Sequence, residues 1–66
     1  MTKIERSDMP RDVLRTVKEW NLREGTYWKT DHAKWGMIYG VEVCGIIHWF
    51  RHQSNTWVQY KRESRP

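Results

Sequence analysis

The first third of the chain carries the hydrophobic pattern of an amphipathic helix. Four apolar residues fall at helical spacing and share one stripe: Val13, Leu14, Val17 and Trp20. Ser7 or Asp8 can cap this helix, and Pro10 suits its first turn because the N–H that proline lacks would be unpaired there. Gly25 is a suitable C-terminal stop. The pattern therefore predicts a helix over about residues 9–23.

After this helix, β-branched and aromatic residues dominate, and the pattern becomes that of strands. Residues 26–30 predict a short strand, and residues 31–34 predict a turn. A long apolar stretch covers residues 35–50, which exceeds the usual strand length of about five or six residues. We therefore expect a bend, bulge or turn at Gly40 or Gly45.

The C-terminal part of the chain predicts one further hairpin. The polar residues 51–55 have the length of a hairpin connector, and residues 56–62 alternate as a last strand. We expect residues 1–7 and 63–66 to be frayed ends of a single small domain spanning residues 1–66. The predicted fold class is α+β, with one N-terminal helix packed on a three- or four-stranded antiparallel sheet.

The predicted core joins the helix stripe to one face of the sheet. Its residues are Val13, Leu14, Val17, Trp20, Val41, Val43, Ile47 and Trp49. If the long apolar stretch is a strand, alternation places the last four of these side chains on a common face. The opposite face is then left exposed and carries aromatic and basic residues, as an antiparallel sheet allows.

The composition limits the cellular compartments and the binding partners that we expect for this chain. The chain has 66 residues and a single cysteine, Cys44, so an internal disulfide is excluded, and its N-terminus lacks the apolar run of a signal peptide. No stretch approaches the roughly 20 apolar residues of a membrane span. We therefore expect a cytoplasmic protein that does not bind a membrane. The net charge of +4 favours polyanionic partners.

One spacing resembles that of metal ligands. Cys44, His48 and His52 form a C-x3-H-x3-H pattern, which on a helix would place all three side chains on one stripe. In a strand, four residues span about 13 Å, which is too far for these side chains to share one ion. The strand assignment therefore argues against a metal, and we expect no cofactor.

Catalytic patterns are weak in this sequence. Cys44 lies in an apolar segment, where thiols are usually inert, and the sequence shows no Ser/His/Asp set, phosphate loop or pair of carboxylates. The best enzymatic hypothesis is a small metal-independent ribonuclease with His48 or His52 as its acid–base group. Lys61 or Arg62 would then stabilise the charge on the phosphate. We expect a non-enzymatic protein instead.

The strongest candidate site combines aromatic and basic side chains of the last two strands. Its residues are Arg51, His52, Trp57, Tyr60, Lys61 and Arg62. Pairing of the two strands would make these side chains neighbours, and rings beside cations can stack bases and hold phosphates. The leading hypothesis is therefore binding of nucleic acid, DNA or RNA, without strong sequence preference.

The tryptophan content supports a rival hypothesis of another class. Five tryptophans in 66 residues, together with a modest net charge, also suit a protein-interaction module such as an inhibitor or adaptor of a larger host protein. Small accessory proteins of phages or mobile elements are often of this kind. The chain would act as a monomer or a homodimer.

Two tryptophans are expected to have opposite roles. Trp20 lies on the helix stripe and should be buried. Trp57 alternates with Val58, so Trp57 faces solvent if Val58 points inward. In that case Trp57 is the best single candidate for a binding anchor.

Overall fold

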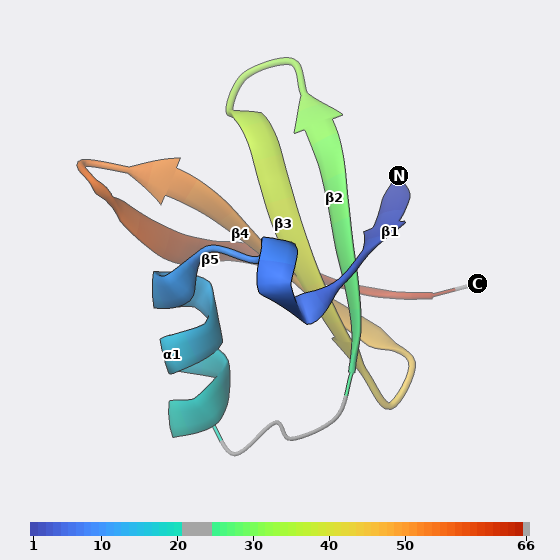
Figure 1. The fold of residues 1–66 in the computed structure, drawn as a ribbon. Coiled ribbons are helices and arrows are strands. Elements are labelled where there is room, and N and C mark those ends of the chain that lie inside the picture. The colour runs from blue at the N-terminus through green and yellow to red at the C-terminus, as the bar shows by residue number, and fades with distance from the viewer. Residues whose placement is uncertain (21–24, 66) are drawn as a thin grey trace.

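The computed structural model describes residues 1–20 and 25–65, and it forms one helix and a five-stranded antiparallel sheet (Figure 1). The elements in chain order are β1 (Thr2–Ile4), the 3-10 turn η1 (Arg6–Asp8), α1 (Arg11–Glu19), β2 (Thr26–His32), β3 (Gly36–Val43), β4 (Ile46–Gln53) and β5 (Thr56–Ser64). The expected α+β class is confirmed. The number of strands is five rather than three or four.

The strands form a simple meander in which each strand pairs with the next, in the order β1-β2-β3-β4-β5. Two of the hairpins turn through only two residues, Cys44–Gly45 and Ser54–Asn55. All four of these residues have positive φ, between 51° and 77°, which is the backbone of a type I′ turn. Of the two glycines at which a bend, bulge or turn was expected, Gly45 lies in a turn and Gly40 lies within β3, and β4 and β5 extend into the predicted 51–55 connector.

The strand that the sequence did not predict lies at the N-terminus. Thr2–Ile4 pairs with β2, with Thr2 opposite Lys29 and Ile4 opposite Tyr27. Ile4 also packs against the core. Burial of this one apolar side chain and pairing along β2 give order to a segment that the sequence predicted to be frayed.

The helix is shorter than the pattern predicted. It begins after Pro10, which is its N-cap, and it ends at Glu19. Ser7 and Asp8 lie in η1 and form no cap for α1, which corrects the expected capping. The predicted end of the helix near residue 23 lies outside the described residues. No helix in residues 1–20 and 25–65 is long and apolar enough to cross a membrane.

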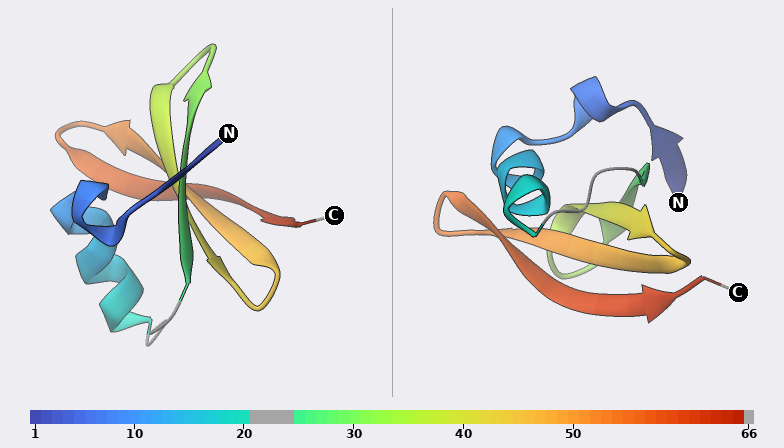
Figure 2. Two further views of the ribbon diagram at one scale, coloured as in Figure 1. Left: turned by 45° about the vertical axis from the view of Figure 1, so that its right-hand side comes forward. Right: turned by 90° about the horizontal axis from the view of Figure 1, so that it is seen from below.

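The helix covers one side of the sheet, which we call the helix face (Figure 2). The buried residues of this layer are Met9, Val13 and Val17 from the N-terminal segment, and Val41 and Phe50 from the sheet. Phe50 and Val13 are essentially inaccessible to solvent. This hydrophobic cluster fixes the position of α1 on the sheet.

The predicted common face of Val41, Val43, Ile47 and Trp49 is wrong, because the turn at residues 44–45 reverses the alternation. The two-residue turn places Val43 opposite Ile46, so the odd residues of β3 share a face with the even residues of β4. Val41 and Val43 therefore face α1, whereas Ile47 and Trp49 lie on the opposite side, which we call the outer face.

The outer face has a hydrophobic cluster of its own. Ile38, Ile47 and Trp49 are buried there, and Trp28, Trp35 and Tyr60 pack against them. The expectation that this face would be left exposed is therefore wrong at its centre. The strongly twisted sheet turns β2–β3 and β4–β5 in different directions (Figure 2), and aromatic rings close this side of the molecule.

Gly40 makes the close packing of the outer face possible. It lies between Trp28 and Trp49 in the register of β2, β3 and β4. A Cβ atom at this position would come within 2.8 Å of the Trp49 ring and of the Ile47 side chain. The missing side chain therefore lets the Trp49 indole lie directly over the strand.

Trp20 is not the buried core residue that the helix stripe predicted. Its side chain is 42% exposed at the C-cap of α1. The indole stacks on Phe50 at 5.7 Å and tilts against His48 at 6.0 Å, measured between ring centroids. Leu14 and Val43 are only partly buried at the edge of the same cluster. The helix ends before its last apolar position is enclosed.

Candidate functional site

A β-bulge at Tyr60 decides where the C-terminal candidate residues point. Phe50 pairs with Gln59, but Trp49 pairs with Lys61, so Tyr60 is an extra residue in β5. The bulge changes the alternation of β5, and Tyr60 and Lys61 both lie on the outer face. The strict alternation assumed from the sequence fails at this point.

The predicted site residues consequently divide between the two faces. Arg51, Tyr60 and Lys61 belong to the outer face. The others, His52, Trp57 and Arg62, lie on the helix face. The structure does pair the last two strands, as expected, but it does not bring these side chains together on one surface.

Trp57 does not have the solvent-facing position that was expected if Val58 pointed inward. It is half-buried, and its ring packs edge-on against Tyr39 at 5.2 Å between centroids. It contributes to the hydrophobic cluster under α1 and also contacts His52 at 5.1 Å. Its position indicates a role in packing.

The structure brings a different set of aromatic and basic residues together on the outer face. The centre is Trp35, in the turn between β2 and β3, with the Arg51 guanidinium carbon 4.0 Å and the Lys34 Nζ 4.7 Å from its ring centroid. His32 lies 6.4 Å from Trp35 and 5.9 Å from Tyr60, between ring centroids. We call these five residues the Trp35 cluster.

The turn that carries Trp35 is held by its own histidine. His32 Nδ1 accepts the backbone N–H groups of Lys34, at 3.0 Å, and of Trp35, at 3.3 Å. Because Nδ1 accepts, the neutral ring carries its proton on Nε2. This local hydrogen bonding stabilises the turn that carries the Trp35 side chain.

The two cations of the Trp35 cluster are not neutralised by a carboxylate. Among residues 1–20 and 25–65, Lys34 and Arg51 form no ion pair, whereas Lys61 pairs with Glu63 at 3.4 Å. Arg51 is half-buried and Lys34 is exposed. Positive charge is therefore concentrated beside an aromatic ring at this end of the outer face.

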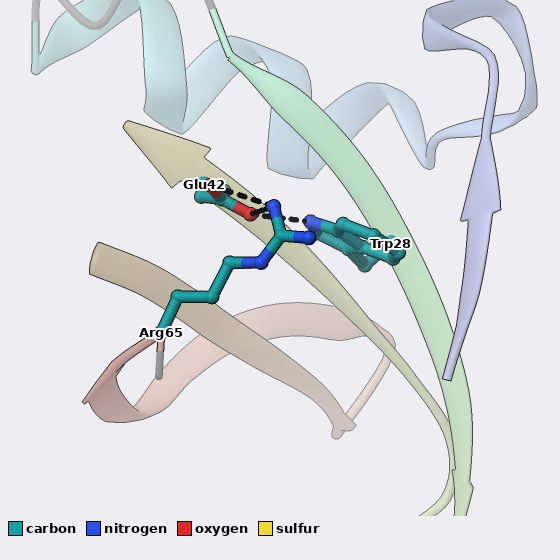
Figure 3. Close-up of polar contacts among 3 residues, drawn as sticks. All are labelled: Trp28, Glu42 and Arg65. Carbon is teal, nitrogen blue, oxygen red and sulfur yellow. Dashed lines mark hydrogen bonds and ion pairs between the residues drawn. The ribbon is translucent and has the colours of Figure 1, made fainter. Parts of the chain in front are cut away.

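A second aromatic-cation group lies on the same face but has its own counter-charge. Trp28 Nε1 donates to Glu42 Oε1 at 3.0 Å, and Arg65 Nη1 donates to both oxygens of Glu42 at 3.1 and 3.2 Å (Figure 3). The Arg65 guanidinium carbon also lies 5.1 Å from the Trp28 ring centroid. These contacts connect the end of the chain to β2 and β3 and neutralise Arg65, whereas Lys3, the cross-strand neighbour of Trp28, forms no ion pair within the described residues.

The same arrangement recurs two strands further along, between β4 and β5. Trp49 Nε1 donates to Glu63 Oε1 at 2.8 Å, and Glu63 also pairs with Lys61. Partial desolvation lowers the pKa of Lys61, but Tyr60 and Glu63 favour the charged form more strongly and leave this pKa raised. Lys61 is thus charged, but its charge is balanced by Glu63 at the rim of the Trp35 cluster.

On the helix face, His48 has the environment of a neutral imidazole. Burial lowers its pKa, and Arg62, its cross-strand neighbour, lowers it further. His48 Nδ1 lies 3.3 Å from the Gln59 amide nitrogen, and its ring contacts Trp20. His48, one of the two histidines that the ribonuclease hypothesis names, therefore has a cation beside it, on the face opposite the Trp35 cluster.

The residues of the C-x3-H-x3-H pattern lie in a turn and in the strand after it. Cys44 is exposed in the turn, and His48 and His52 lie in β4. Within the described part of the chain, no three His, Cys, Asp or Glu side chains lie close enough to hold a metal ion.

Comparisons with known proteins give no relative: no family model matches this chain, and no curated protein or solved structure is significantly similar to it. The site must therefore be interpreted from its own chemistry.

Sequence reasoning missed Lys34 and Trp35, which form the centre of the cluster. The sequence did contain a signal, because a lysine and a tryptophan are adjacent in a short polar turn. A turn places such residues at the surface, and an exposed tryptophan beside a cation is typical of a binding site. The contact with Arg51, from another hairpin, could not be inferred from the sequence.

Proposed function

We propose that this chain is a small non-enzymatic nucleic-acid-binding domain that uses the Trp35 cluster of its outer face. The observation that carries the proposal is the pair of cations, Lys34 and Arg51, held against an aromatic ring without a carboxylate partner in the described structure. The net charge of +4 supports a polyanionic ligand.

The stacked arginine is well suited to this role. Its guanidinium plane offers paired N–H donors to phosphate oxygens, and stacking on Trp35 restricts its side chain before a ligand arrives. Arginine held in this way loses less conformational entropy on binding than a free surface side chain would. The position of Arg51 over the Trp35 ring therefore favours its contact with a phosphate group.

The small number of free cations sets the expected salt dependence. If Lys34 and Arg51 each contact one phosphate, the logarithm of the association constant should fall with the logarithm of salt concentration with a slope of about −1.4 to −1.8. Contacts from Lys61 or Arg65 would make the slope steeper. Sequence preference should be weak, because stacking and phosphate contacts do not identify a base.

The test is a series of fluorescence-anisotropy titrations of labelled oligonucleotides at several salt concentrations. Arg51→Gln and Lys34→Gln should each weaken binding and reduce the salt slope by about one. The matched controls are Arg11→Gln and Lys18→Gln, which remove equal charge from exposed positions of α1. Absence of binding to DNA and RNA at low salt, or equal effects of the control variants, would refute the proposal.

One observation favours a second candidate, a protein-interaction module that uses the helix face. Trp20 and Ile46 are 42% and 38% exposed, and both belong to this side of the molecule. Exposed tryptophan is typical of interface hot spots. Recovery of one stoichiometric partner protein that survives nuclease treatment and is lost with Trp20→Ala would place this candidate ahead of nucleic acid.

A further inference from the structure

We infer that the nucleic acid bound by the Trp35 cluster is single-stranded, and that unpaired bases stack on this cluster. The inference rests on the proposed function and specifies its ligand. It is carried by the combination of few free cations with several accessible rings at one place.

The positive charge of the Trp35 cluster is too small to hold a nucleic acid by itself. A protein that makes about 6–10 phosphate contacts draws much of its affinity from the counterions that it releases. The Trp35 cluster offers two cations without a carboxylate partner in the described residues, while Lys61 and Arg65 are already paired. A ligand that presented only phosphates would therefore be held weakly here.

The rings of the cluster provide what the charge lacks. Trp35, Tyr60 and His32 are each half-buried, so each residue leaves part of its surface open to a ligand, although the Tyr60 hydroxyl is itself buried. Stacking of one base on an aromatic side chain contributes about 1–3 kcal/mol, irrespective of the base. Two or three such contacts would exceed what two phosphate contacts contribute at physiological salt.

Arg51 and Lys34 allow a base to approach the Trp35 ring. The Arg51 guanidinium carbon lies over the Trp35 ring, 4.0 Å from its centroid. It can extend the ring as a stacking surface, because bases stack on arginine planes as well as on aromatic rings. Lys34 is exposed and lies further away, at 4.7 Å. It can leave the ring when a base arrives and then meet the adjacent phosphate.

The fold itself favours unpaired over paired bases. In a duplex the base faces are covered by their neighbours, and proteins reach only the base edges in the grooves. The helix of this domain packs on the opposite side of the sheet through Val13 and Val17. The outer face presents aromatic rings, which can stack only on bases whose faces are exposed.

The decisive experiment compares three probes with the wild-type protein at fixed salt. They are a thymidine oligonucleotide of about 12 nucleotides, an abasic strand with the same number of phosphates, and a duplex of the same length. The thymidine strand should bind about 5- to 150-fold more tightly than the abasic strand for each stacked base. It should also bind more tightly than the duplex.

The outcomes separate the inference from the proposed function. Equal binding of the thymidine and abasic strands, or tighter binding of the duplex, overturns the inference and leaves nucleic-acid binding intact. No binding of any probe overturns the proposed function itself.

A variant locates the stacking. Trp35→Leu should abolish most of the preference for the thymidine strand while binding to the abasic strand persists, because Lys34 and Arg51 remain. Trp20→Leu, a change of the same kind at an exposed site on the helix face, should leave the preference unchanged. An unchanged preference in Trp35→Leu, in protein shown to be folded by circular dichroism, would overturn the inference. If Trp35→Leu does not fold, Arg51→Gln and the three-probe comparison decide.

Discussion

The two faces of the sheet are buried by different means. On the helix face, α1 supplies Val13 and Val17, which enclose Val41 and Phe50 in an aliphatic and aromatic layer. On the outer face, no second helix of the described chain is present, and aromatic rings cover Ile38 and Ile47 instead. A domain of 66 residues can thus close both faces of one sheet.

The difference shows how a small chain can combine stability with binding. One aromatic ring can bury about 150–250 Å², so the four rings of the outer face replace much of the area that a second helix would cover. They belong to Trp28, Trp35, Trp49 and Tyr60. Trp28 and Trp35 are only half-buried, and cations lie against their rings. We therefore expect substitutions on the helix face to act on stability, and those at the Trp35 cluster to act on binding.

The largest effect is expected at the centre of the helix face. Phe50→Ala should lower the free energy of unfolding by about 3–5 kcal/mol, because Phe50 is fully buried and its removal leaves a cavity under α1. Urea denaturation measures this loss. Trp35→Leu, at a half-buried position, should lose clearly less stability. The reverse ranking would contradict the proposed division between the faces.

The next effect tests the close packing of the outer face. Gly40→Ala should lower the free energy of unfolding by about 2–3 kcal/mol, because the added Cβ would lie 2.8 Å from the Trp49 ring. Gly36→Ala is the control, since no described atom lies within 4 Å of a Cβ there and the cost of about 1–2 kcal/mol comes from its positive φ. Thermal melts of both variants give the comparison. An unaffected Gly40→Ala protein would show that Trp49 does not lie over this strand.

A smaller effect is expected where the chain end joins the outer face. Glu42→Gln should cost about 1 kcal/mol, because the amide can still accept from Trp28 but no longer forms the ion pair with Arg65. A double-mutant cycle with Arg65→Gln isolates the pair, and its coupling energy should be about 0.5–1 kcal/mol. A coupling energy of zero would mean that this contact does not hold the C-terminus in solution.

The pH dependence of stability tests the helix face. Burial and Arg62 lower the folded-state pKa of His48 below its usual value of about 6.5. The folded state therefore prefers neutral His48, and its contribution to stability is complete above that value and is lost as the pH falls toward the folded-state pKa. Unfolding midpoints measured between about pH 7.5 and 5 should fall, and His48→Gln should reduce this fall. His52→Gln, at an exposed position of the same strand, is the control.

Regular periodicity carried most of the fold information in the sequence. The helix stripe predicted α1, and the strand composition predicted β2, β5 and one long apolar stretch. The structure divides this stretch into β3 and β4 at Gly45, one of the two glycines at which a bend, bulge or turn was expected. The three residues Thr2–Ile4 contain too little pattern to predict a strand, and only their pairing with β2 creates one. Element type followed from local chemistry, whereas the extra strand depended on tertiary contact.

Face assignment was predicted less well, for two identifiable reasons. The two-residue turn at Cys44–Gly45 and the bulge at Tyr60 each reverse the alternation of side chains. A face assignment that assumes strict alternation along the sequence is therefore wrong beyond each of them. Arg51 and Tyr60 were identified as site residues, but their contacts with the β2–β3 turn join segments distant in the sequence. The sequence therefore predicted the aromatic and basic character of the candidate site, but only some of the residues that form it.

The central claim is that ligand binds to the outer face while the helix face only stabilises the fold. The five indole N–H signals in an ¹H–¹⁵N NMR spectrum report on both faces at once during titration with a thymidine oligonucleotide. Trp35 should shift most, whereas Trp28 and Trp49, whose N–H groups are already bonded to carboxylates, should shift little. Trp20 and Trp57, on the helix face, should remain in place. Largest shifts at Trp20 or Trp57, or no shift at Trp35 when the protein is saturated, would contradict the account.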